Sequence, residues 1–129
     1  MKKTLTGFAF VILATELAAD PTLECSGDTT TQVEIGTCLT ATEKTVDQSI
    51  QTALSIARQS AQSLDEVTGR AASLPALNTA QTNWEAYRSA QCDFVGTTFG
   101  GGSGTGIAIS ACLIDLGRLR VDALLRYAQ

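Results

Sequence analysis

The sequence contains no histidine in its 129 residues. Histidine is the most frequent general base and the most frequent metal ligand, so its absence removes both and excludes histidine-based catalytic triads. Basic residues are also scarce, because 9 Lys and Arg stand against 13 Asp and Glu. The net charge of −4 argues against nucleic acid as a partner, since nucleic-acid binding needs a basic patch.

No apolar run is long enough to span a membrane. The longest run begins at Leu5 and extends over roughly 10 residues, half of the ~20 that a transmembrane helix needs. Two lysines precede this run and small residues ending at Ala19 follow it, which is the pattern of a secretory signal peptide. We therefore expect residues 1–19 to be a signal peptide cleaved near Ala19. Residues 20–129 are predicted to form a single periplasmic or secreted domain without stable membrane insertion.

Cleavage at this point changes the charge of the protein and leaves it without an anchor. The signal contains two lysines and Glu16, so the net charge changes from −4 to −5. An acidic protein of this kind is compatible with a basic protein partner, because opposite net charge speeds encounter. Lipid attachment at Cys25 is disfavoured because the charged Glu24 precedes it, whereas a lipidated cysteine normally follows small residues.

Capping-box sequences indicate where the helices begin. Residues 31–34 have the S/T-x-x-E spacing in which a hydroxyl and a carboxylate each satisfy a free backbone amide, and residues 40–43 repeat it. We therefore predict a short first helix that ends near Leu39 and a long helix that runs to about Val67. Gly69 is well placed to end the long helix.

The second half of the chain predicts two further helices separated by a glycine-rich segment. Pro75 lies just inside the start of the first of these helices, which carries Trp84 as an anchor and extends to about Phe94. The segment from Gly96 to Gly106 is too rich in glycine for a regular element and predicts a flexible loop. The last helix continues to the chain end, and its predicted apolar face consists of Ile109, Cys112, Leu116, Leu119, Ala123 and Tyr127.

These elements predict an all-α fold, an up-down-up three-helix bundle with an additional short N-terminal helix, stapled by two disulfides. Four cysteines behind an export signal favour two disulfides. The bundle topology places Cys92 and Cys112 at one end, where a link would contribute about 3 kcal/mol. By elimination Cys25 pairs with Cys38. The other two connectivities stay open, because the N-terminal segment could fold over the bundle.

The sequence shows no convergent catalytic, cofactor or metal site. The spacings C-x12-C and C-x19-C lack the close cysteine pair with which zinc sites usually start, so disulfides are favoured over a metal. The glycine segment lacks the Gly-Lys-Ser/Thr ending of a phosphate-binding loop and follows no predicted strand. The acidic side chains fall on predicted solvent-facing helix surfaces. We therefore predict a binding protein without cofactors, not an enzyme.

Arg88 is the charged residue with the most distinctive surroundings. It follows Trp84 and Tyr87 on the predicted core-facing side of its helix. We expect its stem to lie on apolar surface while its guanidinium pairs with a carboxylate or a helix end. Ligand contact is the alternative role.

Three segments in this order resemble the lysozyme inhibitor LprI family. They are residues 31–38, the block A-Q-x-x-W-x-x-Y-R-x-x-x-C at residues 80–92, and the glycine segment followed by Cys112 and Arg118. The resemblance covers residues 25–126 and implies a small exported helical domain with Trp84, Tyr87, Arg88 and Arg118 as its structural motif. The member after which the family is named blocks lysozyme, a basic hydrolase, whereas many relatives have no established activity. That member is described as a lipoprotein, and its membrane anchorage is not carried over to this chain.

The resemblance suggests lysozyme as the partner, and physical reasoning suggests how it is blocked. Lysozyme uses two carboxylates in a cleft. A narrow loop pinned at its cysteines would fill that cleft and hydrogen-bond the carboxylates. The alternatives are a loop that merely tethers two helices, and an envelope protein that binds another protein or a glycan without inhibiting lysozyme. The predicted contact residues are Gly101, Gly102, Ser103, Gly104 and Thr105.

Overall fold

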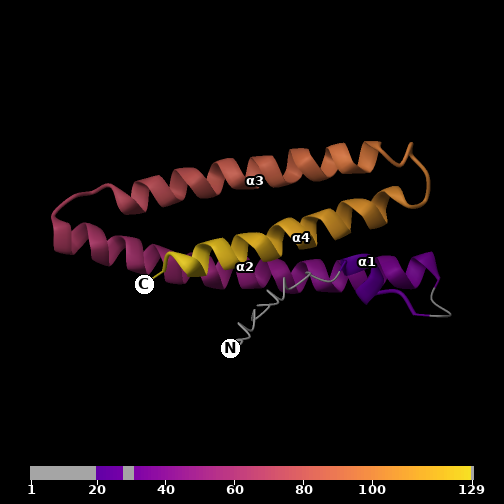
Figure 1. The fold of residues 1–129 in the computed structure, drawn as a ribbon, viewed down its shortest axis with the longest axis horizontal. Coiled ribbons are helices and arrows are strands. Elements are labelled where there is room, and N and C mark those ends of the chain that lie inside the picture. Colours follow the sequence, from indigo (N-terminus) through magenta and orange to yellow (C-terminus); the bar gives the residue numbers. More distant parts are fainter. Residues whose placement is uncertain (1–19, 28–30, 129) are drawn as a thin grey trace, which may run out of the picture.

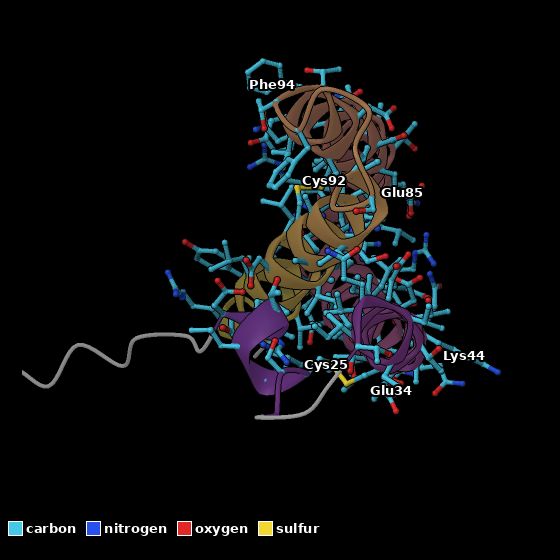
Figure 2. All side chains as sticks on the ribbon, turned by 90° about the vertical axis from the view of Figure 1, so that its right-hand side faces the viewer. Cys25, Glu34, Lys44, Glu85, Cys92 and Phe94 are labelled. Carbon is cyan, nitrogen blue, oxygen red and sulfur yellow. A yellow bond between two sulfur atoms is a disulfide. The ribbon has the colours of Figure 1, made fainter. Side chains whose placement is uncertain are left out.

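The fold is all-α, as predicted. The computed structural model describes residues 20–27 and 31–128, so the predicted signal peptide lies outside the described residues. Three long helices run up, down and up, and α4 lies between α3 and α2 in both views (Figures 1 and 2). None of the described helices is long and apolar enough to cross a membrane. The helices are α1 (Pro21–Glu24), α2 (Gln32–Thr68), α3 (Ser73–Thr97) and α4 (Thr105–Arg126).

The two ends of α2 form as the sequence predicts. The backbone N–H of Thr31 donates to a Glu34 carboxylate oxygen at 2.8 Å, and the Thr31 hydroxyl oxygen accepts the N–H of Glu34 at 3.3 Å. The two bonds satisfy two amides that helix geometry leaves free. The Thr31 backbone N–H and the Thr31 hydroxyl, which both donate to the Glu34 carboxylate, lower the pKa of Glu34. At the other end Gly69 has φ 66°, a left-handed conformation that glycine adopts without steric cost.

The predicted break near Leu39 is wrong, because α2 continues through it. The hydroxyl of Thr40 donates to the Gly36 carbonyl at 2.9 Å, and that of Thr42 donates to the Cys38 carbonyl. These hydroxyls therefore bond back within the helix instead of capping a new one. Leu39 is fully buried and belongs to the same apolar stripe as the residues that follow it, which gives the helix a reason to continue. The short N-terminal helix is instead α1, capped by the side chain of Asp20.

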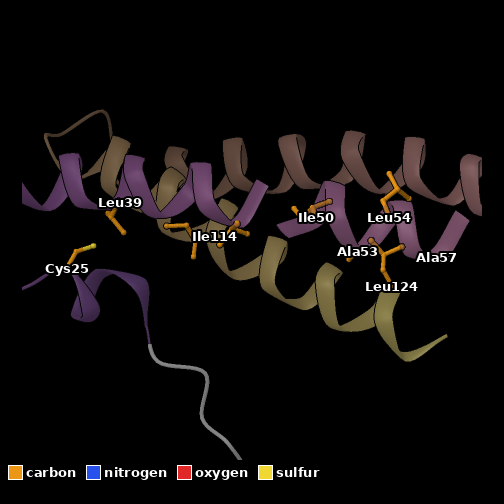
Figure 3. Packing of buried hydrophobic residues seen from close by; sticks show 9 residues of the cluster. Cys25, Leu39, Ile50, Ala53, Leu54, Ala57, Ile114 and Leu124 are labelled. Carbon is orange, nitrogen blue, oxygen red and sulfur yellow. The ribbon is translucent and has the colours of Figure 1, made fainter. Parts of the chain in front are cut away.

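The core lies mainly between α2 and α4. Leu39, Ile50, Ile114 and Leu124 are buried together along this contact (Figure 3). At about 0.8 kcal/mol per buried methylene, this stripe supplies much of the energy that holds the two helices together. Trp84 of α3 packs against the same cluster, as its predicted anchoring role requires.

The predicted buried face of α4 is partly wrong. Leu119 is 63% exposed and Tyr127 is 80% exposed, whereas Ile114, Gly117 and Leu124 are buried. Gly117 explains the difference, because a Cβ at this position would overlap Cγ1 of Val46. The absent side chain lets α4 approach α2 closely along a stripe that a count of large apolar residues does not reveal.

The connection between α3 and α4 is shorter than predicted. Helix α3 continues past Phe94 to Thr97 and α4 begins at Thr105, so the loop comprises residues 98–104. Successive turns organise it, since Phe99 N–H donates to the Gly96 carbonyl and Gly102 N–H donates to the Phe99 carbonyl. Glycine therefore breaks the helix only at the centre of the predicted segment.

Both disulfides join the predicted partners. The Cys25–Cys38 bond links α1 to the start of α2, and the Cys92–Cys112 bond links the end of α3 to the start of α4. Cys38 lies in the first turns of α2, Cys92 in the last turns of α3 and Cys112 in the first turns of α4, so both bonds lie toward the end of the bundle that carries the loop. This end of the molecule is covalently closed, whereas the α2–α3 hairpin at the other end contains no disulfide.

Candidate functional site

Arg88 connects three helices. Its Nη1 donates to Oδ1 of Asp47 in α2 at 2.8 Å, and its Nε and Nη2 donate to the Leu113 carbonyl in α4 at 3.0 and 2.7 Å. The expected carboxylate partner is therefore present, and the second acceptor is a carbonyl within a helix. Gly117 leaves this carbonyl accessible, since a Cβ there would lie 3.1 Å from Arg88 Nη2. Through these contacts one side chain joins α2, α3 and α4.

Two guanidinium groups lie close to the Trp84 ring. The Arg88 guanidinium carbon is 5.4 Å from the centre of the indole ring, and that of Arg120 is 5.5 Å from it. Both distances fall within the range of cation–π attraction. Tyr87, in contrast, is 53% exposed, so it is not part of the core as its position beside Trp84 suggested.

Arg118 fixes the N-terminal helix to the bundle. Its Nη1 and Nη2 donate to the two carboxylate oxygens of Glu24, both at 2.7 Å. This two-point geometry is the strongest form of an arginine–carboxylate pair, and the hydrogen bonds lower the pKa of Glu24. Together with the Cys25–Cys38 disulfide, the pair places α1 beside α4 at the loop end.

The loop presents part of the predicted contact set. Gly101, Gly102 and Ser103 are exposed, whereas Gly104 and Thr105 are half-buried. The Thr105 hydroxyl oxygen is buried and has no hydrogen-bond partner within the described part of the chain, so it faces inward. The partner contact of these five residues stays a prediction, and the geometry favours the first three as those that a partner reaches.

Two hollows flank this loop. One is about 440 Å³ in volume and is lined by hydroxyl-bearing residues of α2 and α4 together with Ser103. The other, also about 440 Å³, lies between α1, α3 and α4 and contains Tyr87 and Phe99 beside Asp20 and Asp115. The second hollow combines aromatic and acidic side chains, a composition suited to a protein surface that carries basic residues.

Asp115 gives this second hollow an unusual carboxyl group. Burial raises its pKa, the nearby Asp20 raises it further, and Arg118 lowers it. The aromatic side of this hollow is open, because Tyr87 and Phe99 are each about half exposed. Phe94, in the same part of α3, is also exposed and points away from the bundle (Figure 2). We call the loop, Tyr87, Phe99, Asp20 and Asp115 the loop-end surface.

The structure unites some predicted residues and separates others. Ser103, the cysteines and Tyr87 belong to the loop end, whereas Trp84 and Arg88 lie in the helical interior. Three acidic residues that the sequence did not single out prove to be organised, namely Glu24, Asp47 and Asp115. Among the described residues, no group of acidic and cysteine side chains has the arrangement of a metal site.

The sequence resembles a known family over most of its length. A family model described as "Lysozyme inhibitor LprI" matches residues 25–124. No curated protein and no solved structure matches the chain. The matched segment contains all four cysteines, the Trp84–Arg88 block and the loop.

Proposed function

This chain belongs to the lysozyme inhibitor LprI family, and on that premise we propose that it is an exported protein that inhibits lysozyme by occluding the active-site cleft with its loop-end surface. The match to the family is the observation that carries the proposal. The two disulfides are consistent with an oxidising compartment, and residues 1–19 have the pattern of a cleaved signal peptide. Release into the periplasm or the medium follows from this pattern.

The shape and charge of the loop support occlusion. Residues 98–104 carry no ionisable side chain, so they can approach two carboxylates without like-charge repulsion. Gly101 and Gly102 add no side chain to the width of the loop tip, and the exposed hydroxyl of Ser103 can donate a hydrogen bond to a carboxylate. A narrow, neutral, hydrogen-bonding tip suits a cleft built to hold a polysaccharide.

The remainder of the loop-end surface supplies binding energy and speed of encounter. Aromatic side chains are frequent hot spots of interfaces, and Tyr87 and Phe99 are both more than half exposed. Asp20 and Asp115 place negative charge beside the tip, which favours encounter with a basic lysozyme. The aromatic groups should therefore determine the dissociation rate of the complex, and the acidic groups should determine the association rate and its dependence on salt.

To test this proposal, the rate at which lysozyme digests peptidoglycan is measured while the oxidised protein is added in increasing amounts. The protein is produced from the full 129-residue sequence and exported by its host, and a reduced and alkylated sample is measured in parallel. We expect stoichiometric inhibition that disappears on reduction. If the protein inhibits no class of lysozyme, the proposal is overturned, and an envelope protein that binds another protein or a glycan is favoured.

Variants then locate the contact. Gly102 does not have a positive φ, so Gly102→Leu widens the tip without the backbone strain expected at Gly101, which has φ 78°. We expect Gly102→Leu and Phe99→Ala each to weaken inhibition at least tenfold, about 1.4 kcal/mol or more. The matched control is Ser63→Leu, which adds the same side chain to an exposed position at the far end of α2. Equal inhibition by Gly102→Leu and Ser63→Leu would contradict binding through the loop.

A further inference from the structure

The α2–α3 hairpin is poorly covered at the end remote from the loop. Helix α2 has no buried residue after Ala57, and α3 has none before Gln81. Helix α4 ends at Arg126, so the hairpin extends beyond it (Figure 1). A cavity of about 330 Å³, which we call the hairpin cavity, lies where the three helices diverge.

Small apolar side chains leave this space empty. Ala61, Ala80 and Ala123 contribute one face each from α2, α3 and α4, and Leu77 adds a larger apolar wall. Tyr127 also lines the cavity and is 80% exposed, so the cavity communicates with solvent near the end of α4. The lining is suited to an aliphatic group that enters from outside.

The hairpin cavity also has one positively charged group that forms no ion pair with a described residue: burial lowers the pKa of Arg120, and only the more distant charge of Glu85 acts against this. Arg120 lines it, and its Nε donates to Oε1 of Gln81 at 3.0 Å. Its Nη2 is buried and has no hydrogen-bond acceptor within the described residues. Arg88 and Arg118 differ in this respect, because each of them forms an ion pair with a carboxylate, whereas Arg120 forms none with any described residue.

Leaving a buried guanidinium N–H without an acceptor is costly, since a charged donor loses its water without replacement. The Gln81 oxygen accepts only the Nε of Arg120 and does not reach its Nη2, while the Gln81 amide group donates to Glu85 at 2.9 Å. An acceptor brought by a ligand would remove this cost. A carboxylate is the best match, because it accepts in the plane in which a guanidinium donates.

We propose that the hairpin cavity binds a single-chain aliphatic carboxylate of the fatty-acid class, with its head group on Arg120 and its chain against Leu77, Ala61 and Ala80. The cavity volume lies at the lower end of the range for small-molecule sites, about 300–1,000 Å³, which accommodates one chain and excludes a two-chain lipid. The cavity is lined by the last turns of α2 and α4 and the first turns of α3, whereas the loop between α3 and α4 lies at the other end of the bundle (Figure 1). The proposal therefore does not depend on lysozyme inhibition.

Calorimetric titration of the oxidised full-length protein with decanoate tests this inference. The titration is made at about pH 8, where the carboxyl group is ionised, and below the concentration at which decanoate forms micelles. We expect saturable binding of one decanoate per chain. We expect 1-decanol, which has the same chain and a neutral head group, to bind at least about tenfold more weakly, because it forms no charge-assisted hydrogen bond with Arg120.

Two pairs of variants assign the site. Ala61→Leu fills the cavity with a good helix former and should abolish binding, whereas Ser63→Leu in the same helix should leave it unchanged. Arg120→Gln should weaken decanoate binding about tenfold or more, whereas Arg126→Gln, which removes an exposed arginine of the same helix, should not. If Arg120→Gln fails to fold, the comparison of decanoate with 1-decanol reports the contribution of the charge.

Each contrary result overturns the inference. If decanoate does not bind saturably, the proposed class of ligand is wrong. If Ala61→Leu binds decanoate as well as the unchanged protein does, the proposed location is wrong. If decanoate and 1-decanol bind equally well, Arg120 does not bind the head group as proposed. Lysozyme inhibition is measured on the same samples, so a failure of the cavity proposal is distinguished from a failure of the inhibitor proposal.

Discussion

Gly117 lies at a close contact between α4 and α2, and the Arg88 side chain lies beside it. A Cβ at this position would overlap Val46 Cγ1 and would lie 3.3 Å from Ile50 Cδ1 and 3.1 Å from Arg88 Nη2. The same small residue therefore permits the packing of two helices and the hydrogen bonds that join the third. One methyl group would disturb both.

Replacing Gly117 by alanine should destabilise the protein. Alanine is the better helix former by about 1 kcal/mol, but insertion of a methyl group into a closely packed contact costs about 1–3 kcal/mol. We expect a net loss of up to about 2 kcal/mol in the free energy of unfolding, measured by urea denaturation.

Gly36→Ala is the matched control for this substitution. Gly36 lies inside α2, and no atom lies within 4 Å of the position its Cβ would take. The same change should stabilise the protein there by up to about 1 kcal/mol. Stabilisation by both substitutions would contradict the close contact at Gly117.

At the scale of the element, α2 is one helix with two different environments. Up to Ala57 it presents a buried stripe to α4, and beyond Ala57 it contributes no buried residue. Asp65 is the main fixed point of the hairpin, since its carboxylate accepts the backbone N–H groups of Ser73 at 2.7 Å and Leu74 at 3.0 Å. Local opening should therefore begin at the hairpin.

Native-state hydrogen exchange should reveal this difference. We expect the amides of residues 60–68 to exchange with a lower free energy of opening than those near Ile50, because fewer apolar contacts must separate. Gly69→Ala should lower it further, by about 1 kcal/mol, since alanine at φ 66° is strained. Uniform protection along α2, or an effect of Gly69→Ala on the core amides alone, would contradict a separately opening hairpin.

The sequence predicts the elements of this molecule better than the details that create its sites. The capping box at residues 31–34 and the cap at Gly69 are local signals, and both are confirmed. The break near Leu39 was wrong because a Thr-x-x-Glu spacing is equally compatible with a helix interior, where packing decides. The buried face of α4 was missed because Gly117 counts as neutral in any apolar pattern.

The candidate sites show the same division. The loop and the cysteine pairs follow from composition and bundle topology. The two hollows beside the loop and the cavity at Arg120 depend on where α4 begins and ends relative to its neighbours. A local sequence pattern does not predict this relative position. Ile114, Gly117, Val121 and Leu124 do step by three and four, and this spacing is the signal that could have indicated the correct face.

For the whole molecule, the two disulfides close separate segments of the chain. Cys25 and Cys38 are 13 positions apart, and Cys92 and Cys112 are 20 positions apart. Chain entropy predicts that each bond contributes about 3 kcal/mol. Because the closed segments do not overlap, the two contributions should add.

Paired Cys→Ala variants measure these contributions. Alanine is preferred to serine because Cys92 is almost completely buried and a hydroxyl there would lack an acceptor. We expect denaturant unfolding to show a loss of about 3 kcal/mol for each variant and about twice that for the variant without disulfides. A combined loss far from the sum would indicate that the two segments are coupled through the bundle.

Neither disulfide crosses from the α1–α2 part of the chain to the α3–α4 part. Within the described residues these two parts are connected covalently by the short turn at residues 69–72 alone, although α2 and α4 form the main contact of the core. A single proteolytic cut in this turn would yield two fragments, each internally crosslinked and each bearing one face of that contact. The molecule is thus arranged as two complementary halves, and the turn is the natural position at which to divide it into a pair of separately expressed fragments that reassemble without a covalent link.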